Sequence, residues 1–347
     1  MDLLGTSETV LRIIIGTIGV TIFGIVFGLF YKGIDRKISA HMQGRIGPPI
    51  VQPFRDVRKL FTKENIVPEN SIPWIFNLIP LLGLVATITI LIYLPIGGFQ
   101  PIISWGGDLI LILYLLIFPS LALVIGGFAS GSPYAVVGSQ REMATMIAYE
   151  FPLAIIIISL AWKLSQVGGE NVFTLSTIIG NPIWNSVTGP LGFIGFAILL
   201  FVLIIVTPAE LSKIPFDAPE AETEIAGGLL VEYSGRNLAM FYLTDSVKTV
   251  VMASIIVALF IPYNLSNLAI LGLQSGSYIA YAVDVIFYLI KLFIVILFSV
   301  TLIRVAIARL KIDQIVYTYW IPLTLLSLVG LIFIMWDGFI MNALGLV

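Results

Sequence analysis

The sequence predicts an all-α, polytopic integral membrane protein with eight transmembrane helices and structured cytoplasmic loops. Three features predict this class: 59% of the 347 residues are hydrophobic, only 11% are charged, and the mean hydropathy is +1.05. A soluble domain does not keep so much apolar surface away from water. Because a membrane-spanning helix needs about 20 mostly apolar residues and eight such runs occupy most of the chain, we expect residues 1–347 to form a single transmembrane domain.

The eight expected spans follow from consecutive apolar runs. They are residues 9–31, 73–94, 107–129, 143–162, 191–208, 246–263, 280–303 and 315–336. The first run is long enough to span, and no small-residue cleavage site follows it, so we expect no removed signal segment. Thr207 and Pro208 are expected to end the fifth span, because proline disfavours continuation of a helix.

Lysine and arginine concentrate on one side of this topology. Of 18 basic residues, 14 fall in loops 1, 3, 5 and 7, whereas the opposite loops contain only Lys163. The positive-inside rule therefore predicts that these four loops are cytoplasmic and that both termini lie outside, in a multi-pass protein of the cell membrane. We find no convincing internal repeat, which argues against the inverted-repeat secondary transporters.

The first loop, residues 32–72, is a basic surface with expected local structure. It combines eight basic residues with several prolines and an amphipathic run near 53–62. Such a segment can bind anionic lipid headgroups or form an ordered platform for a soluble subunit. Because lipid and subunit contacts explain a basic cluster beside a spanning helix, we expect no nucleic-acid partner.

Metal and redox chemistry find little support in this composition. The chain contains no cysteine and one histidine, His41. Disulfides, thiolate metal sites and an iron–sulfur cluster held by this chain alone are therefore excluded. We expect no metal site and no cofactor in this chain.

The fifth loop, about residues 209–244, carries the densest group of acidic residues. Its five carboxylates within sixteen residues are Asp217, Glu220, Glu222, Glu224 and Glu232. Ionised groups beside hydrocarbon are expensive, so we expect them to have a use, and we favour proton handling. The alternative is a solvated acidic face that docks a basic partner.

The spacing of these carboxylates predicts a short helix from about 218 to 233. Asp217 precedes Glu220 at the spacing of a capping box. On this helix Glu220 and Glu224 would share one face, while Glu222 would point away. In a partly dry site, repulsion between two carboxylates is expected to keep one of them protonated near neutral pH.

Several ionisable residues are expected inside the spans. Glu150 would lie roughly 12 Å inside the fourth span, and Lys291 near the middle of the seventh, with Asp284 on the same face. Such groups usually face the bundle interior, so we predict a functional role for Glu150 and Lys291, with an internal salt bridge as the alternative. Asp245 and Lys248 lie near the inner end of the sixth span. Asp108 and Asp337, at outer ends, are expected to contact water.

Three polar segments occur in a recognisable order on the predicted cytoplasmic face. They are DRKISAHMQGRIGP (35–48), GSPYAVVGSQREMATMIAYE (131–150) and PFDAPEAETEIAGGLLVEYSG (215–235). With these segments the chain resembles, over nearly its whole length, an eight-helix membrane subunit of respiratory complex I and of membrane-bound nickel–iron hydrogenases. In both complexes this subunit anchors the redox arm, and in complex I it is called the NADH dehydrogenase subunit 1 type, or H type. The short first loop, in which Pro48 and Pro49 run almost directly into Gln52 and Pro53, resembles the hydrogenase branch (the M type of membrane subunit) and related ferredoxin-driven sulfur-reducing complexes.

This resemblance implies the anchor and coupling subunit of an ion-translocating, ferredoxin-dependent hydrogenase, without catalysis in this chain. The implied partners are an iron–sulfur small subunit and a nickel–iron large subunit on the cytoplasmic face, which would carry the iron–sulfur clusters and the nickel–iron centre, and antiporter-like membrane subunits. The alternatives are the equivalent subunit of a quinone-reducing complex I or of a sulfur-reducing relative and, more weakly, a stand-alone ion transporter.

The resemblance and the depth of Lys291 also give two sets of candidate residues. The proton- or ion-coupling set is Glu150, Asp217, Glu220, Glu222, Glu224, Glu232 and Lys291. The set expected at the interface with the redox arm is Asp35, Arg36, Arg45, Asp56, Arg141, Lys213 and Arg236. Loops 1 and 5 together are expected to form the docking face.

Overall fold

The computed structural model of the protein describes residues 3–104, 106–166, 171–266 and 277–343, with side chains described between residues 11 and 337. Within this part of the chain, eight helical segments are long and apolar enough to cross a membrane. They are Leu11–Met42, Pro73–Tyr93, Asp108–Ala129, Pro133–Gln166, Pro190–Glu210, Gly235–Phe260, Tyr278–Ala306 and Ile312–Asp337. Each contains most of one predicted span, so the all-α, eight-span architecture is confirmed.

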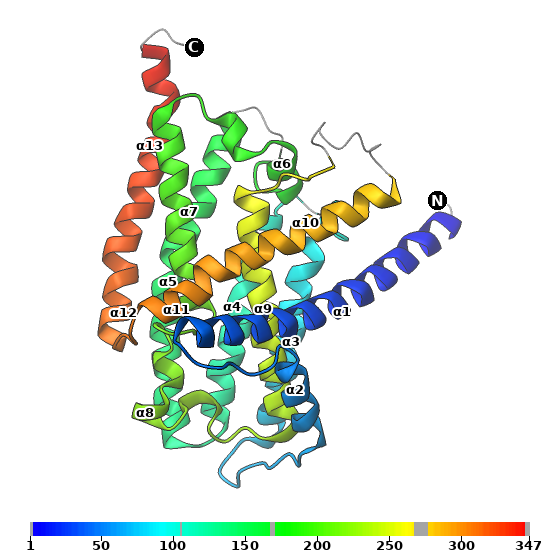
Figure 1. Cartoon of the computed structure of the whole chain (residues 1–347), viewed down its shortest axis with the longest axis vertical. Helices are drawn as coiled ribbons and strands as arrows, with labels where there is room; N and C mark the ends of the chain where they lie inside the picture. The colour runs from blue at the N-terminus through cyan, green and yellow to red at the C-terminus, as the bar shows by residue number, and fades with distance from the viewer. Residues whose placement is uncertain (1–2, 105, 167–170, 267–276, 344–347) are drawn as a thin grey trace.

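The helices follow one another in a simple order (Figure 1). They are α1 (Leu3–Met42), α2 (Gln52–Thr62), α3 (Pro73–Tyr93), α4 (Asp108–Ala129), α5 (Pro133–Gln166), α6 (Leu175–Gly180), α7 (Pro190–Glu210), α8 (Glu222–Ile225), α9 (Gly235–Phe260), α10 (Tyr278–Ile296), α11 (Leu302–Ala306), α12 (Ile312–Thr318) and α13 (Thr324–Ala343). Short π-helical segments at Leu297–Thr301 and Tyr319–Leu323 join α10 to α11 and α12 to α13.

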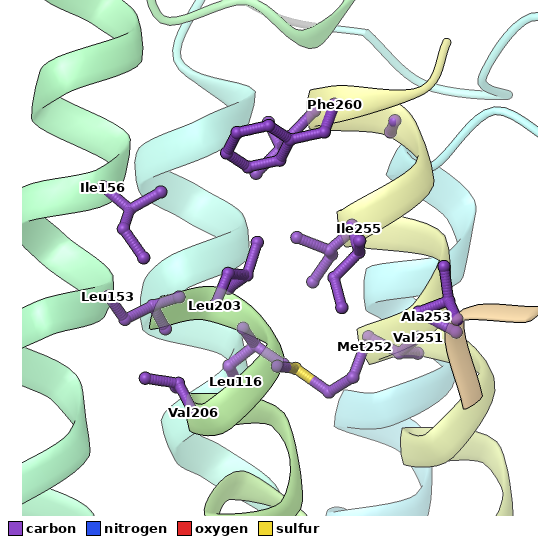
Figure 2. Packing of buried hydrophobic residues seen from close by; sticks show 14 of the residues in the cluster. Leu116, Leu153, Ile156, Leu203, Val206, Val251, Met252, Ala253, Ile255 and Phe260 are labelled. Atoms are coloured by element: carbon purple, nitrogen blue, oxygen red, sulfur yellow. The ribbon is translucent and has the colours of Figure 1, made fainter. Parts of the chain in front are cut away.

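Helix α9 runs through the middle of the bundle, and almost all of its residues are buried. Most of its side chains are apolar or small on every face, which is the pattern of a helix without an exposed side. Figure 2 shows Met252 and Ile255 of α9 beside Leu203 of α7, Leu116 of α4 and Ile156 of α5. Because lipid is as apolar as these side chains, close packing rather than exclusion from water stabilises this core.

Two helices cross the bundle obliquely. Figure 1 shows α1 and α10 running at a steep angle to α5, α7 and α13. The span Leu11–Met42 has 32 residues, about 48 Å of helix at 1.5 Å per residue, whereas the hydrocarbon core is about 30 Å thick. Helix α1 is therefore tilted, and its second half, which carries Lys32, Asp35 and Arg36, reaches the polar end of the bundle.

The polar end, formed by the loops 43–51, 63–72, 211–234 and 307–311, differs from the prediction in three helix limits. Helix α1 continues to Met42, so the first basic residues of loop 1 are helical, and the amphipathic run of that loop forms α2. Helix α5 begins at Pro133, ten residues before the predicted start, and therefore includes Arg141. Helix α7 continues through Pro208 to Glu210, so the predicted stop at Pro208 is wrong.

The opposite end of the bundle contains a buried ion pair. Nζ of Lys163 on α5 lies 3.3 Å from Oδ2 of Asp337 at the end of the last span, and both side chains are at most 4% exposed. Asp337 also accepts hydrogen bonds from the backbone N–H groups of Thr188 and Gly192. The expectation that Asp337 contacts water is therefore wrong, because its oxygens tie the last span to α5 and α7. Asp108 is fully buried, so the same expectation is wrong there.

Helix α1 packs closely against α9 at Gly28. A Cβ added there would lie 2.6 Å from the carbonyl oxygen and 2.8 Å from the carbonyl carbon of Ser246. These are backbone atoms, which cannot move aside as a flexible side chain can. Contacts through small residues of this kind let two membrane helices pack backbone to backbone. One turn further along α1, the same contact brings Lys32 beside α9.

We therefore predict that Gly28→Ala lowers the midpoint of thermal unfolding, since inserting a methyl group into a packed contact typically costs about 1–3 kcal/mol. The matched control is Gly19→Ala on the same helix, because no heavy atom lies within 4 Å of a Cβ added at Gly19. Unfolding of the purified protein, followed by circular dichroism, distinguishes the two. Equal losses of stability in both variants would contradict the close α1–α9 contact.

Candidate functional site

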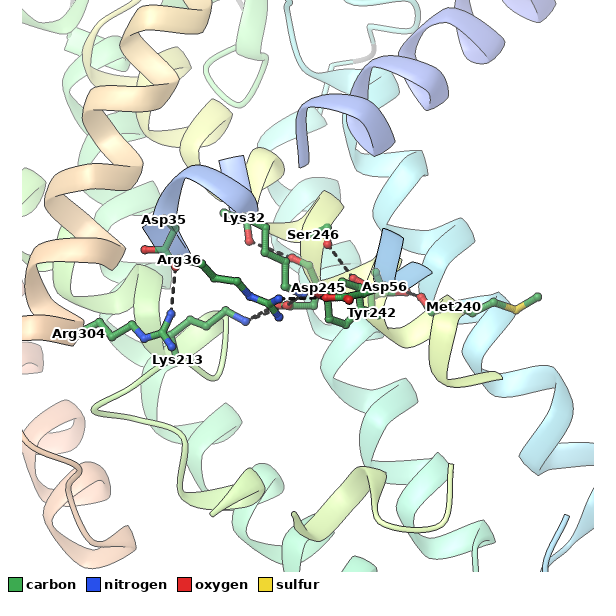
Figure 3. A network of polar contacts seen from close by, with 12 residues as sticks. Lys32, Asp35, Arg36, Asp56, Lys213, Met240, Tyr242, Asp245, Ser246 and Arg304 are labelled. Carbon is green, nitrogen blue, oxygen red and sulfur yellow. Dashed lines mark hydrogen bonds and ion pairs between the residues drawn. The ribbon is translucent and has the colours of Figure 1, made fainter. Parts of the chain in front are cut away.

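Two lysines share one carboxylate at the polar end (Figure 3). Nζ of Lys32 on α1 lies 2.5 Å from Oδ2 of Asp245 on α9, and Nζ of Lys213, which follows α7, lies 2.7 Å from Oδ1. The Lys32 ammonium also lies 3.4 Å from the centroid of the Tyr242 ring, a cation–π contact. These three ionic groups join α1, α9 and the loop after α7, and they carry one more positive than negative charge.

Three further ion pairs surround this cluster. They are Arg36–Asp56 (3.2 Å), Arg304–Asp35 (3.0 Å) and Arg309–Asp217 (2.5 Å). The first joins α1 to α2, the second joins α11 to α1, and the third joins the loop after α11 to the loop after α7. Because these pairs are partly exposed, each contributes little to stability. Their main effect is to fix the positions of the loops.

The acidic loop, residues 211–234, is not the single helix that the sequence predicts over 218–233. It consists of three short turns at Ala218–Glu220, Glu222–Ile225 and Gly228–Leu230. Ala226 and Gly227 have φ values of 53° and 94°, and a right-handed helix cannot continue through left-handed backbone. The predicted capping by Asp217 is also wrong, because its side chain makes no cap hydrogen bond and instead binds Arg309 through both oxygens.

This broken backbone separates carboxylates that the prediction had paired. Glu224 is exposed, and its Oε2 lies 2.5 Å from Nη1 of Arg141. Glu220 instead lines the same two cavities as Glu222. The prediction that Glu220 and Glu224 share a face while Glu222 points away is therefore wrong, because Glu220 and Glu224 lie on different turns.

Two adjoining cavities connect the surface with the helix core. Their volumes are about 370 Å³ and 450 Å³. The residues common to both are Lys32, Arg36, Ser212, Lys213, Glu220 and Glu222. The first cavity extends to Glu210 and Lys248, and the second extends to Asp217 and Arg309. Among the described residues, no group of three or more histidine or acidic side chains could hold a metal ion.

The cavity walls perturb one carboxyl group of the acidic loop. Burial raises the pKa of Glu220, and the negative charge of Asp245 raises it further, whereas Lys213 and Lys32 oppose the shift. Glu220 therefore keeps its proton to a higher pH than a glutamate in water. A change in the charge of its surroundings would alter how readily it releases that proton.

A buried ion pair lies behind the first cavity. Oε1 of Glu210, the last residue of α7, lies 2.7 Å from Nζ of Lys248 on α9, and these side chains are 2% and 6% exposed. Lys248 also donates to the backbone carbonyl of Glu210 (2.6 Å) and to Oγ of Ser120 (2.8 Å). Oε1 of Glu210 lies within ion-pair distance of this ammonium but accepts no hydrogen bond from the described residues. The hydroxyl groups of Ser120 and Tyr149 lie 3.1 Å apart and extend the network to α5.

Two glutamates on α5 extend this network into a polar line, which consists of Glu220, Glu142, Glu210 and Glu150. Glu142 is buried, accepts a hydrogen bond from Oγ of Ser212 at 3.3 Å, and interacts electrostatically with Glu210 and Glu220. Glu150 lies halfway along α5 and interacts electrostatically with Glu210. Its Oε1 is buried without a hydrogen-bond partner among the described residues. Glu150 is deeper in its helix than predicted, because α5 begins ten residues earlier.

Some predicted residues lie away from this line. Lys291 donates to the backbone carbonyls of Ile261 (3.0 Å) and Tyr263 (2.9 Å), at the far end of α9. Arg45 and Arg236 are exposed at the polar end, and Glu232 is half-buried. No ion pair of these three residues occurs within the described parts of the chain. The polar end therefore brings together most, but not all, of the predicted residues.

The structure adds site residues outside the predicted set. Glu142, Glu210, Asp245 and Lys248 form the connection between the acidic loop and Glu150. Their sequence signal is their position inside or at the end of apolar runs, where an ionised group is costly. Glu210 was not predicted as a site residue, because the fifth span was expected to end at Pro208 and Glu210 would then lie outside it.

Comparisons with known proteins agree with the arrangement of the helices. A protein-family model described as "NADH dehydrogenase" matches residues 15–335. The chain is 29% identical over 338 residues to the H subunit of the F(420)H(2) dehydrogenase of Methanosarcina mazei, covering 90% of this chain and 91% of the relative. A chain in the structure of the membrane-bound sulfane sulfur reductase, an archaeal respiratory membrane complex, is similar with a TM-score of 0.78 and 26% identity, covering 92% of this chain and 98% of that one.

The raised pKa of Glu220 predicts a pH dependence of stability. In the unfolded chain this carboxyl titrates near its ordinary pKa of 4.5, so the folded state binds more protons between that value and the raised one. The contribution of Glu220 to the free energy of unfolding therefore falls as pH rises through this window. We expect Glu220→Gln, which cannot ionise, to make the unfolding midpoint less sensitive to pH.

The measurement is a series of thermal unfolding midpoints from pH 4 upward, at pH intervals on the order of half a unit. A pKa shift of one unit corresponds to about 1.4 kcal/mol of stability, so the change in midpoint is measurable at this spacing. Glu69→Gln, at an exposed loop residue, is the control and should follow the wild-type curve. Parallel curves for wild type and Glu220→Gln would show that Glu220 does not titrate differently on folding.

Proposed function

Because the chain belongs to the NADH dehydrogenase family of complex I membrane subunits, we propose that it anchors a peripheral redox arm and couples its chemistry to ion translocation. The relatives that it resembles are subunits or chains of respiratory membrane complexes. The observation that carries the proposal is the polar line from the acidic loop to the middle of α5. This line runs through Glu220, Glu142, Glu210 and Glu150.

The proposed mechanism is electrostatic and begins at the acidic loop. Redox turnover in the docked arm changes the charge or the position of this loop and so shifts the proton occupancy of Glu220. Lys32 and Lys213 lie next to Asp245, so a displacement of the loop also changes the field that opposes proton binding. Asp217, Glu222, Glu224 and Glu232 are proposed to respond to the arm at the surface.

The signal then passes to Glu210, whose charge is balanced by Lys248. A proton that arrives on Glu142 or Glu210 weakens this ion pair and changes the field at Glu150. Glu150 is proposed to transmit the change to neighbouring membrane subunits of antiporter type. Coupling of this kind is a free-energy linkage between sites, so its proof is a change in transport rather than spatial order.

The docking face is proposed to be cytoplasmic, with both termini outside, because the basic residues concentrate in its loops. Asp35, Arg36 and Asp56 hold α1, α2 and α11 in place below this face. Arg45 and Arg236 are exposed there and free to meet a partner. Arg141 and Lys213 are proposed to position the acidic loop against the arm.

We assign the arm to the nickel–iron hydrogenase type, driven by ferredoxin. The support is the short first loop, in which α2 begins four residues after Pro48. The redox centres would lie in an iron–sulfur small subunit and a nickel–iron large subunit. A sulfur-reducing arm is the second candidate, and the similarity to a sulfane sulfur reductase chain favours it. The similarity to a dehydrogenase subunit keeps a quinone-type acceptor as a further alternative.

The coupling role predicts a separation of redox and transport activities. Glu220→Gln and Glu150→Gln should each leave electron transfer from reduced ferredoxin to an artificial acceptor at the wild-type rate. Ion uptake into vesicles that contain the complex should fall by about a hundredfold, the lower limit for loss of one proton-transfer group. Glu69→Gln is the exposed control. Wild-type transport in both site variants would remove the polar line from the mechanism.

The identity of the arm is predicted by what purifies with the chain. Affinity purification through this subunit should recover iron–sulfur proteins and hydrogen-evolving activity with reduced ferredoxin. Sulfide formation from sulfane sulfur without hydrogen evolution would instead select the sulfur-reducing arm. A chain that purifies alone and transports ions by itself would overturn the coupling role.

A further inference from the structure

A large apolar groove lies at the end of the bundle opposite the acidic loop. Its volume is about 640 Å³, within the range of ligand-binding cavities. It lies between α1, the segment 94–102 that follows α3, and α10. Its lining includes Gly16, Gly19, Phe23, Leu94, Phe99 and Val285. None of these residues belongs to the polar line, so this cavity is independent of the proposed coupling role.

Two glycines of α1, Gly16 and Gly19, line this groove. A Cβ added at Gly19 would meet no heavy atom within 4 Å, whereas a Cβ added at Gly16 would lie 2.9 Å from Cδ1 of Ile102 in the segment 94–102. A Cβ at Gly24, further along α1, would instead meet Leu91 and Val247 of the bundle. Figure 1 shows the first half of α1 extending obliquely from the bundle toward the N-terminus. The helix therefore contacts the segment 94–102 at Gly16 and the bundle at Gly24, and it leaves an open space at Gly19.

One end of this groove is charged. Arg12 lines it and is the second residue of the span Leu11–Met42. Its side chain is exposed and has no ion-pair partner among the described residues. A basic side chain at the end of a membrane helix reaches toward the headgroup layer. Gln100, which also lines the groove, adds an amide donor.

The depth and the lipid exposure of the groove point to its occupant. Neighbouring side chains of α1, such as Ile15 and Ile18, are 61% and 55% exposed, so membrane hydrocarbon reaches this face directly. An apolar channel that ends at headgroup level in a guanidinium without an ion pair among the described residues matches one chemistry, an apolar chain attached to a phosphate. Guanidinium binds phosphate through paired hydrogen bonds.

We propose that this groove binds an anionic membrane phospholipid, with one apolar chain between α1 and the segment 94–102 and its phosphate on Arg12. The bound chain fills the space that Gly19 leaves open. It thereby connects the first half of α1 to α10 and to the segment after α3. The site is specific for charge, because Arg12 is the basic group in its lining.

The test uses the intact complex in vesicles that contain equal amounts of phosphatidylglycerol and phosphatidylcholine analogues, each with a photoactivatable diazirine in one acyl chain. After illumination, mass spectrometry counts the lipid adducts on peptides that contain residues 12–23 or 94–102. We expect about fivefold more phosphatidylglycerol than phosphatidylcholine adducts, the preference that one basic side chain gives near a charged bilayer surface.

Three variants and one control give this test its specificity. Arg12→Gln should equalise the two lipids, and Arg12→Lys should keep most of the preference. Gly19→Leu should fill the groove and remove most adducts of both lipids without a clash, because its Cβ meets nothing nearby. Ile18→Leu, on the exposed face of α1, should behave as wild type.

Equal labelling of both lipids in the wild type, or a preference that survives Arg12→Gln, would overturn the proposal. Cross-links from these peptides to another protein subunit, in place of lipid adducts, would overturn it as well and would make the groove a protein interface. If Gly19→Leu fails to assemble, the Arg12 pair decides the outcome alone. Ion transport is not the readout, so failure of the coupling role leaves this result unaffected.

Discussion

The carboxylate of Asp245, shared by the ammonium groups of Lys32 and Lys213, is the interaction on which the polar end depends. It joins three segments that are far apart in the sequence, and each of them carries part of the site. Helix α1 reaches this carboxylate because Gly28 allows close contact with α9. The acidic loop is fixed beside it by Lys213, so Glu220 experiences two positive charges and two negative charges, the latter from Asp245 and Asp217. The close backbone contact at Gly28 therefore also determines that the charge of Lys32 acts on Glu220.

Much of the fold could be predicted from the sequence, because a membrane-spanning helix is recognised by a run of about 20 mostly apolar residues. The limits of α5 and α7 could not, since polar residues beside Pro133 and an internal Pro208 conceal a helix that tertiary contacts extend. The acidic loop was mispredicted as a helix because its composition suits one, whereas Ala226 and Gly227 adopt left-handed backbone. Pairs such as Glu210–Lys248 join residues 38 positions apart, and spacing along the chain carries no information about such a contact.

The polar line contains two kinds of buried carboxylate. Glu210 forms an ion pair with Lys248, and removing either partner would leave an uncompensated charge. Glu150 forms no ion pair with any described residue. A compensated group holds its state firmly, whereas an uncompensated one responds to small changes nearby. With both kinds of carboxylate in one line, the protein can hold a stable charge state at Glu210 and still respond at Glu150 to a change of charge nearby.

The central position of α9 has a consequence for how the protein is made. This helix is the least apolar of the eight spans, and it places Asp245 and Lys248 near its middle, where each charge adds about 2.5–3.5 kcal/mol to insertion of an isolated helix. Their partners Lys32, Ser120, Glu210 and Lys213 all precede α9 in the chain. These groups are therefore synthesised before α9. The order of the chain supplies the counter-charges before the helix that needs them.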